Sequence, residues 1–223
     1  MERGDLLPYK KPRLAILALH GWTGNALSME PISKSFNYPN TKWVLPQAPY
    51  FAKETSQNRK EDPVIGYSWS ESTLRGRDYP KSRSLEKSMI MISQCIHDLE
   101  NEGFDKKNIF ILGFSQGAIF SIWFTINQKF SLGGCISIAG GFKKEKLRIS
   151  KSITQESRGT SILLMHGQND KIIPPEESQN TYQIFDSLGF NVELILYQAA
   201  HKIPIKAKEL IWNFLTSRNQ KPT

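Results

Sequence analysis

Several features that mark whole classes of protein are scarce in this chain of 223 residues. No apolar run approaches the roughly 20 residues that a helix needs to cross a membrane. The first residues, MERGDLLPYKKPR, carry charges and proline where a secretory signal peptide needs an apolar stretch, so we expect no export. Only two cysteines occur, Cys95 and Cys135, and both lie in apolar runs. We therefore expect buried free thiols and a cytoplasmic location.

Acidic residues are too few to balance the basic ones, and the formal net charge is +8. Part of this charge lies in the run KKEKLRISK, residues 143–151. Such a run is usually a solvated loop, and the alternative is attraction to anionic lipid or to an acidic protein. Basic residues interleaved with stacking aromatics, which typify nucleic-acid modules, are absent. We therefore expect no nucleic-acid partner and at most peripheral contact with a membrane.

What the chain does contain is an alternation of short apolar runs and longer amphipathic ones. Most of the short runs are continuously apolar, which is typical of parallel strands that are buried on both faces. The expected strands are 13–19, 42–46, 108–113, 133–140, 161–166 and 192–197. The expected helices are 84–102, 115–128, 175–188 and 205–217, with a shorter one near 27–36. This pattern predicts one α/β domain over residues 1–223, with a mostly parallel central sheet and helices on both faces.

The segment 50–81 interrupts this alternation. It is polar, it is rich in Gly, Pro, Arg and Ser, and it shows little periodicity. A loop of this length in a compact domain is usually functional or disordered. Because the segment follows a strand that ends near Pro46, it leaves the sheet at the edge where open α/β sheets bind ligands. We expect it to be an active-site loop or lid.

One hydroxyl lies between two glycines at a junction of strand and helix. The residues from Gly113 to Gly117 match G-x-S-x-G, with Ser115 at the centre. In such a turn the glycines make room for a sharp bend that exposes the serine, and the following helix offers free N–H groups. The alternative is a tight turn that happens to contain a serine. The strand before it and the helix after it favour a nucleophile.

A serine nucleophile needs a base, and only two histidines follow Ser115 in the chain. His166 ends an expected strand, where it can be a satisfied core residue. His201 follows the last expected strand and precedes the last helix. In α/β-hydrolases the order along the chain is serine, acid, histidine, so we favour His201 as the base.

The base needs a carboxylate to orient it, and few acidic residues follow the serine. Asp170 lies on a short loop after a buried strand, which favours it, although it could also cap the next helix. Glu176 and Glu177 fall in the first turn of that helix, where the dipole accounts for them. Asp186 lies in the middle of the helix.

Two backbone donors are needed to stabilise the oxyanion that forms during acyl transfer. The N–H of Gln116, next to the serine, is one candidate. The other comes from an early strand-to-helix loop, here LHGWTGNA at 19–26, in which the N–H of Trp22 is the natural donor. The alternative for His20 and Gly21 is a plain tight turn.

At these residues the chain resembles the acyl-protein thioesterase and phospholipase/carboxylesterase family of the α/β-hydrolases. The resemblance implies that Asp170 is the acid, that His201 is the base and that His166 is structural. It also places Trp22 where relatives often have Leu, and Ser70 where Phe is common. The segments that carry it are LHGWTGN at 19–25, LPQAP at 45–49, GYSWSE at 66–71, GFSQGA at 113–118, HGQNDKIIP at 166–174 and AAHKIP at 199–204.

The expected function is therefore a serine hydrolase of carboxylic esters or thioesters that works through an acyl-enzyme and needs no metal or cofactor. Trp22, Tyr67 and Trp69 are candidates for an apolar acyl pocket, and Phe142 is more typical of the core. Substrates of short to medium acyl chain, lysophospholipid or acylated protein fit this reading, and the protein could be a monomer or a homodimer. The alternatives are a catalytically silent binding protein and a serine peptidase or acyltransferase with the same three residues.

Overall fold

The computed structural model describes residues 14–54, 64–71, 85–142 and 153–217. The basic run 143–151 lies outside the described residues, as do 55–63 and 72–84, which contain much of the predicted lid. No helix within the described ranges is long and apolar enough to cross a membrane.

The centre of the molecule is a parallel sheet, and its strands coincide with the six apolar runs of the sequence. Neighbouring strands pair in parallel, in the order β2-β1-β5-β6-β7-β8. Most of their side chains are fully buried, which accounts for the continuously apolar sequence. The strands are β1 Leu14–Leu19, β2 Thr41–Val44, β5 Ile109–Phe114, β6 Gly134–Ile138, β7 Ile162–Gly167 and β8 Val192–Tyr197.

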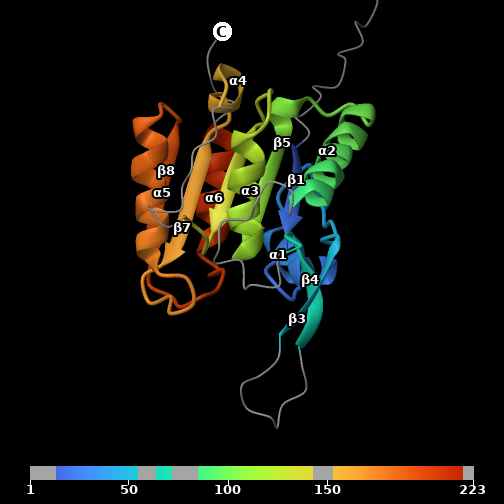
Figure 1. Ribbon diagram of the computed structural model, residues 1–223. Coiled ribbons are helices and arrows are strands. Elements are labelled where there is room, and N and C mark those ends of the chain that lie inside the picture. The colour runs from blue at the N-terminus through green and yellow to red at the C-terminus, as the bar shows by residue number, and fades with distance from the viewer. Residues whose placement is uncertain (1–13, 55–63, 72–84, 143–152, 218–223) are drawn as a thin grey trace, which may run out of the picture.

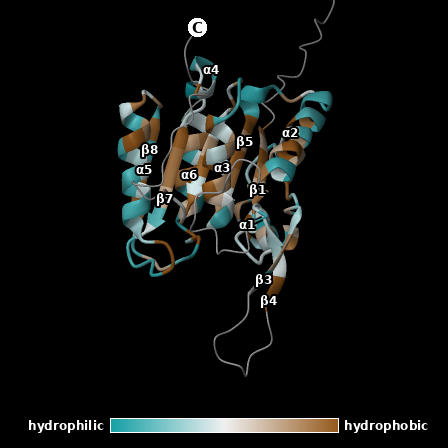
Figure 2. Cartoon of the chain, in the orientation of Figure 1, coloured by the Kyte–Doolittle hydropathy of each residue, from teal (hydrophilic) through white to brown (hydrophobic). Residues whose placement is uncertain are grey.

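Helices cover both faces of this sheet, as the sequence predicts (Figure 1). One face carries α2 Glu86–Asn101, α3 Gln116–Ile126 and α5 Pro175–Ser187, which share a core with Leu17 and Leu19 of β1. The other face carries η1 Ala26–Met29, α1 Glu30–Phe36 and α6 Ala207–Ser217, which pack with the alternate residue Ile16. Two short helical segments, η3 Lys106–Asn108 and α4 Gln155–Arg158, lie in connections. Strands β5 and β7 are largely brown in Figure 2, and the outer side of α5 is largely teal.

The topology fixes where a ligand can bind. The chain passes from β1 to β2 on one side of the sheet, and from β5 to β6, β7 and β8 on the other. Strands β1 and β5 are neighbours, so the loops that leave their carboxyl ends diverge and leave a crevice between them. Ser115 and Trp22 lie in these two loops.

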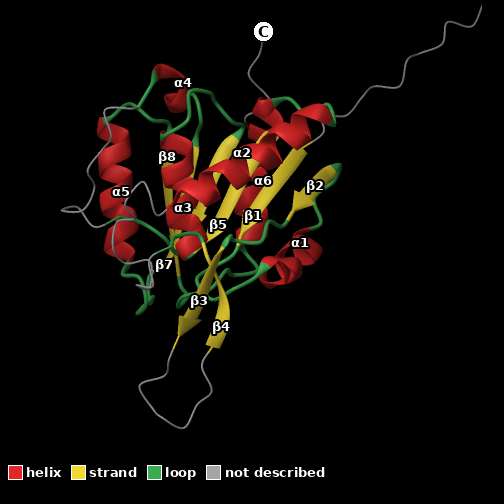
Figure 3. Ribbon diagram, turned by 45° about the vertical axis from the view of Figure 1, so that its right-hand side comes forward, coloured by secondary structure: helices red, strands yellow, loops and turns green. Residues whose placement is uncertain are grey.

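The segment 50–81 differs from the sequence-based expectation of an irregular loop. Its described residues include an antiparallel two-stranded ribbon, β3 Tyr50–Glu54 and β4 Val64–Ser68, which projects beyond the carboxyl edge of the sheet (Figure 3). The ribbon also pairs with the loop after β1: the N–H of Thr23 donates to Tyr67 O at 3.0 Å, and the N–H of Tyr67 donates to Gly24 O at 2.9 Å. The ribbon is therefore hydrogen-bonded to the loop that carries Trp22.

Candidate active site

Ser115 occupies a strained turn between β5 and α3. Its φ is +56° and its ψ is −117°, a backbone conformation that residues other than glycine rarely adopt. The turn is held on both sides, because the N–H of Ser115 donates to Ile138 O of β6 at 3.0 Å while its carbonyl accepts from the N–H of Ala118 at 3.0 Å. Strain of this kind persists only where the surrounding structure maintains it, and it is concentrated at functional sites.

The two glycines around Ser115 are required by close packing. A Cβ on Gly117 would lie 2.5 Å from Leu19 O and 2.6 Å from His20 O, so the start of α3 lies directly against the end of β1. A Cβ on Gly113 would overlap the backbone of Gly117. The glycines therefore bring the serine close to the loop after β1.

His201 lies beside Ser115, as the sequence predicts. It comes from the loop between β8 and α6, and its Nε2 is 2.9 Å from Ser115 Oγ. The ring of Phe114 packs against the imidazole, with ring centroids 4.9 Å apart. The side chain of His201 is 15% exposed, so it can be reached from solvent while its orientation is fixed.

Asp170 completes the line of contacts. Its Oδ2 lies 2.6 Å from His201 Nδ1, and its Oδ1 accepts from the N–H groups of Ile172 at 2.8 Å and Ile173 at 3.0 Å. Burial disfavours the charged carboxylate, but the hydrogen bonds from His201 and from these two N–H groups outweigh it, so the pKa of Asp170 lies below its ordinary value. A charged carboxylate at this position keeps the proton of His201 on Nδ1, which leaves Nε2 free to accept a proton from Ser115.

His166 lies behind Asp170 and has no exposed surface. Its Nε2 is 2.9 Å from Ile173 O and 3.3 Å from Asp170 Oδ2, and its Nδ1 is 2.5 Å from Ser178 Oγ. Burial is the largest influence on the pKa of His166 and lowers it, which favours the neutral ring. The sequence marks this residue as structural, but it carries no signal that His166 contacts the same carboxylate oxygen as His201.

The loop after β1 presents a backbone donor to the site. Residues 21–24 form a tight turn, in which the N–H of Gly24 donates to Gly21 O at 3.0 Å. Within the described ranges, neither the N–H of Trp22 nor the N–H of Gln116 has an acceptor. Both residues line the same pocket as Ser115. The two predicted oxyanion donors are therefore brought together with the serine.

The pocket at Ser115 has a volume of about 380 Å³. Ser115 and His201 contribute its polar wall, while Trp22, Ile119 and Ile172 are among its apolar residues. Lys171, the residue after Asp170, also lines it. A small, mostly apolar space next to a hydroxyl suits an acyl chain of modest length.

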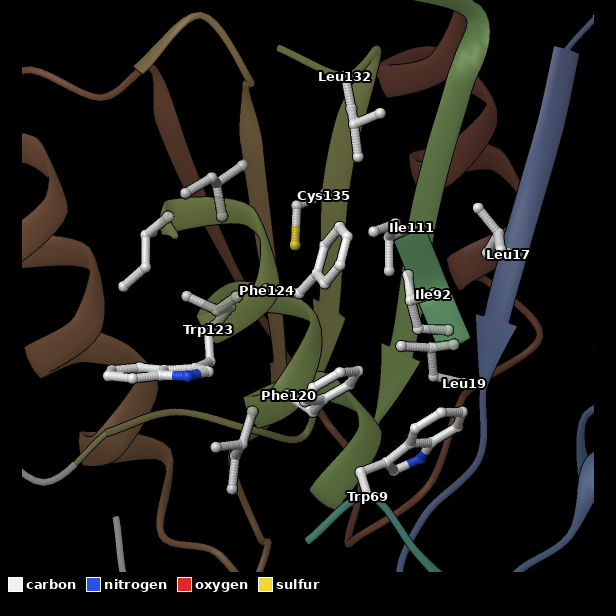
Figure 4. Packing of buried hydrophobic residues seen from close by; sticks show 14 of the residues in the cluster. Leu17, Leu19, Trp69, Ile92, Ile111, Phe120, Trp123, Phe124, Leu132 and Cys135 are labelled. Atoms are coloured by element: carbon white, nitrogen blue, oxygen red, sulfur yellow. The ribbon is translucent and has the colours of Figure 1, made fainter. Parts of the chain in front are cut away.

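Two of the three predicted pocket aromatics do not line this space. Trp69 is fully buried and stacks on Phe120 of α3 with ring centroids 5.3 Å apart, so its assignment to the pocket is wrong (Figure 4). Tyr67 is 40% exposed on the ribbon, outside the residues that line the pocket. Trp22 does line it, and Phe142 is buried in the core as expected. An aromatic near a motif indicates burial, but the sequence does not tell which cavity it faces.

No group of three or more His, Cys, Asp or Glu side chains within the described part of the chain is arranged to hold a metal ion.

Comparison with known proteins agrees with the fold. The family model described as Phospholipase/Carboxylesterase matches residues 7–219, nearly the whole chain. The chain belongs to the phospholipase/carboxylesterase family. It is therefore a hydrolase of the ester-cleaving type, built on the α/β-hydrolase fold.

Relatives in the phospholipase/carboxylesterase family share about a quarter of their residues with this chain. Carboxylesterase SOBER1 of Arabidopsis thaliana is 27% identical over 220 residues, covering 92% of this chain and 91% of the relative. Acyl-protein thioesterase 1 of Kluyveromyces lactis is 23% identical over 176 residues, covering 77% and 75%. A relative from Oryza sativa, 23% identical over 196 residues and covering 82% and 75%, is named a probable inactive carboxylesterase. Family membership therefore gives the type of hydrolase, and the catalytic residues and the substrate are argued from the site.

Solved structures of the family have the same fold. The crystal structure of Arabidopsis thaliana SOBER1 superposes with a TM-score of 0.78 at 24% identity, covering 93% of this chain and all of that one. Zea mays acyl-protein thioesterase 2 superposes with a TM-score of 0.68 at 18% identity, covering 96% of each chain.

Proposed function

We propose that this protein hydrolyses carboxylic esters or thioesters of short to medium acyl chain through an acyl-enzyme on Ser115. The observation that carries the proposal is the continuous line of hydrogen bonds from Asp170 through His201 to Ser115, at 2.6 Å and 2.9 Å. These distances lie within the range in which a base can take the proton of a nucleophile.

In the proposed reaction, His201 Nε2 accepts the hydroxyl proton as Ser115 Oγ attacks the acyl carbonyl. The carbonyl oxygen becomes an oxyanion, which accepts hydrogen bonds from the N–H groups of Trp22 and Gln116. Gln116 is the first residue of α3, so the helix dipole also favours the negative charge. His201 then returns its proton to the departing alcohol or thiol, and the acyl group stays on Ser115. Water, deprotonated by the same histidine, releases the acid and restores the serine.

The acyl group occupies the pocket of about 380 Å³, and the alcohol or thiol leaves toward solvent. Small esters, lysophospholipids and acylated proteins meet these requirements, because each presents an acyl chain on a larger leaving group. Relatives named carboxylesterase and acyl-protein thioesterase support this range of substrates.

A catalytically silent protein is the alternative, and one relative is named probable inactive. A protein that has lost turnover usually lacks one of the three residues or their contacts. Here all three residues are present and in contact. This observation favours turnover over silent binding.

Hydrolysis of p-nitrophenyl acetate, p-nitrophenyl butyrate and the matching thioesters tests the proposal. We expect turnover by the wild type and a fall in kcat of about 10⁵–10⁶-fold in Ser115→Ala, as for other enzymes in which a triad serine is removed. Ser121→Ala, which removes another buried hydroxyl from the same helix, is the matched control and should keep the wild-type kcat. Equal rates for the wild type and Ser115→Ala would refute the proposal.

A further inference from the structure

His20 is a fully buried histidine at the end of β1, and both of its ring nitrogens are hydrogen-bonded. Its Nδ1 lies 2.7 Å from Gly21 O, and its Nε2 lies 3.2 Å from the backbone nitrogen of Ala48. A carbonyl only accepts and a backbone N–H only donates, so these partners fix the tautomer. Nδ1 carries the proton and donates it to Gly21 O, while Nε2 accepts from Ala48. Burial lowers the pKa of His20, and the neutral ring keeps this arrangement.

The carbonyl that His20 binds belongs to the same peptide unit as the N–H of Trp22. Two donors converge on Gly21 O: His20 Nδ1 at 2.7 Å and the N–H of Gly24 at 3.0 Å. A trans peptide is planar, and its N–H points away from its C=O. Fixing the carbonyl on the inner side of the turn therefore directs the N–H of Trp22 outward, to the side where the pocket lies.

The imidazole is itself held in place by a buried aromatic residue. The ring of Trp69 lies 5.2 Å from the ring of His20, and Trp69 Nε1 donates to His20 O at 2.8 Å. Trp69 is in turn bound to the start of α3, because its N–H donates to Gln116 Oε1 at 3.0 Å. The loop that offers Trp22 and the helix that offers Gln116 are thus connected through His20 and Trp69.

We propose that His20 is a positioning residue for the reaction, which holds the Gly21–Trp22 peptide so that the Trp22 N–H binds the oxyanion. The proposal rests on the proposed function, since it needs an oxyanion at this place. His20 does not touch the substrate and transfers no proton. Its contribution arises in the transition state, when the carbonyl oxygen gains its charge.

Replacing His20 with Phe keeps a ring against Trp69 and removes the donor to Gly21 O. We expect the rate constant of acylation to fall about 10- to 100-fold in H20F, less than the ~10²–10³-fold effect of deleting an oxyanion donor outright, because the peptide loses its orientation but keeps its N–H. The substrate dissociation constant should stay within about twofold, since the ground-state carbonyl gains little from this N–H. Stopped-flow measurement of the acylation burst separates the two constants.

Replacing His20 with Asn keeps a nitrogen donor at nearly the position of Nδ1. We expect H20N to recover most of the acylation rate that H20F loses, with the acid limb of the pH–rate profile unmoved in both variants. Phe214→Leu, in the core on the opposite face of the sheet, is the matched control for lost stability and should acylate at the wild-type rate.

Three outcomes would overturn the proposal for His20: wild-type acylation by H20F, equal loss in H20F and H20N, or a shift of the acid limb in H20F. The last would show that the substitution acts on His201 instead. Absence of turnover in the wild type refutes the proposed function. If the wild type is active and H20F acylates equally fast, only the role of His20 is refuted.

Discussion

Asp170 is expected to act on the reaction only through His201, and its substitution separates charge from position. In Asp170→Asn the amide keeps the shape of the carboxylate but no longer favours the tautomer with the proton on Nδ1. We expect kcat for p-nitrophenyl butyrate to fall about 10⁴-fold, the effect seen where such an aspartate is neutralised in other serine hydrolases. Asp186→Asn, on the exposed side of α5, is the control. A loss below tenfold in Asp170→Asn would contradict this assignment.

Trp22 lines the pocket, and in the proposed reaction its N–H also binds the oxyanion. Leucine keeps the N–H and occupies less volume, so Trp22→Leu should lengthen the space for the acyl chain. We expect the ratio of kcat/KM for p-nitrophenyl octanoate to that for the acetate to rise, by about tenfold for a few additional buried methylenes. An unchanged chain-length profile would show that the indole does not limit the acyl chain.

At the scale of single residues, the sequence predicts which groups meet but not how they are held. Ser115 and His201 lie 86 positions apart, and their order and neighbouring glycines suffice to pair them. The contacts that hold these residues in place are not predictable in this way. The bonds of His20 to Gly21 and of His166 to Asp170 depend on the direction in which buried rings point. That direction produces no recurring pattern of residues in the sequence. For the same reason Trp69, expected in the pocket, lies in the core.

At the scale of elements, the side chain of Gln116 ties α3 to the end of the ribbon. Its Oε1 accepts from the N–H of Trp69 at 3.0 Å, and its Nε2 donates to Ser68 Oγ at 2.8 Å. All of these groups are buried. Gln116→Leu would leave the Trp69 N–H without its partner, and we expect the free energy of unfolding to fall by about 1–3 kcal/mol.

Urea denaturation of Gln116→Leu beside Gln128→Leu measures this connection. Gln128 follows the same helix, and among the described residues the one partner of its side chain is Phe124 O, at 3.2 Å in a partly buried place, so its loss should cost less. An equal effect of the two substitutions would mean that the buried bonds of Gln116 add nothing to the attachment of the ribbon.

The elements themselves differ in how far the sequence predicts them. The strands of the central sheet are predictable because most are continuously apolar, and two buried faces demand that pattern in β1, β5, β6 and β7. The strands β3 and β4 are not, since they are five residues each and buried on one face only, with Phe51 and Ile65 exposed on the other. One face of the ribbon, with Ala52 and Ser68, is buried, and its position depends on the pairing of the two strands and on the hydrogen bonds to the loop at Thr23. The polar composition of the segment 50–81 therefore predicts a loop and not the ribbon.

At the scale of the whole molecule, two buried neutral histidines should couple stability to pH. Burial lowers the pKa of both His20 and His166 from the ordinary value of 6.5. Below pH 6.5 the unfolded chain takes up protons that the folded chain does not, so the folded state loses stability as the pH falls. We expect the free energy of unfolding to decrease by up to about 1.4 kcal/mol per pH unit for each histidine.

Urea titrations between pH 8 and pH 5 measure this slope. The slope should become shallower in His166→Gln, which removes one of the two groups, and stay the same in His97→Gln, whose side chain is exposed. A free energy of unfolding that is flat between pH 6.5 and pH 5 would contradict the burial of two neutral imidazoles.

The central claim, that Ser115 carries the acyl group, is tested most directly by trapping the intermediate. After mixing with p-nitrophenyl butyrate and quenching in acid, the wild type should gain the mass of one butyryl group, and peptide mapping should place it on Ser115. His201→Ala, which keeps the serine but removes its base, should show no such mass on the same timescale. A butyryl group on any other residue, or an equal gain of mass by Ser115→Ala, would contradict the account.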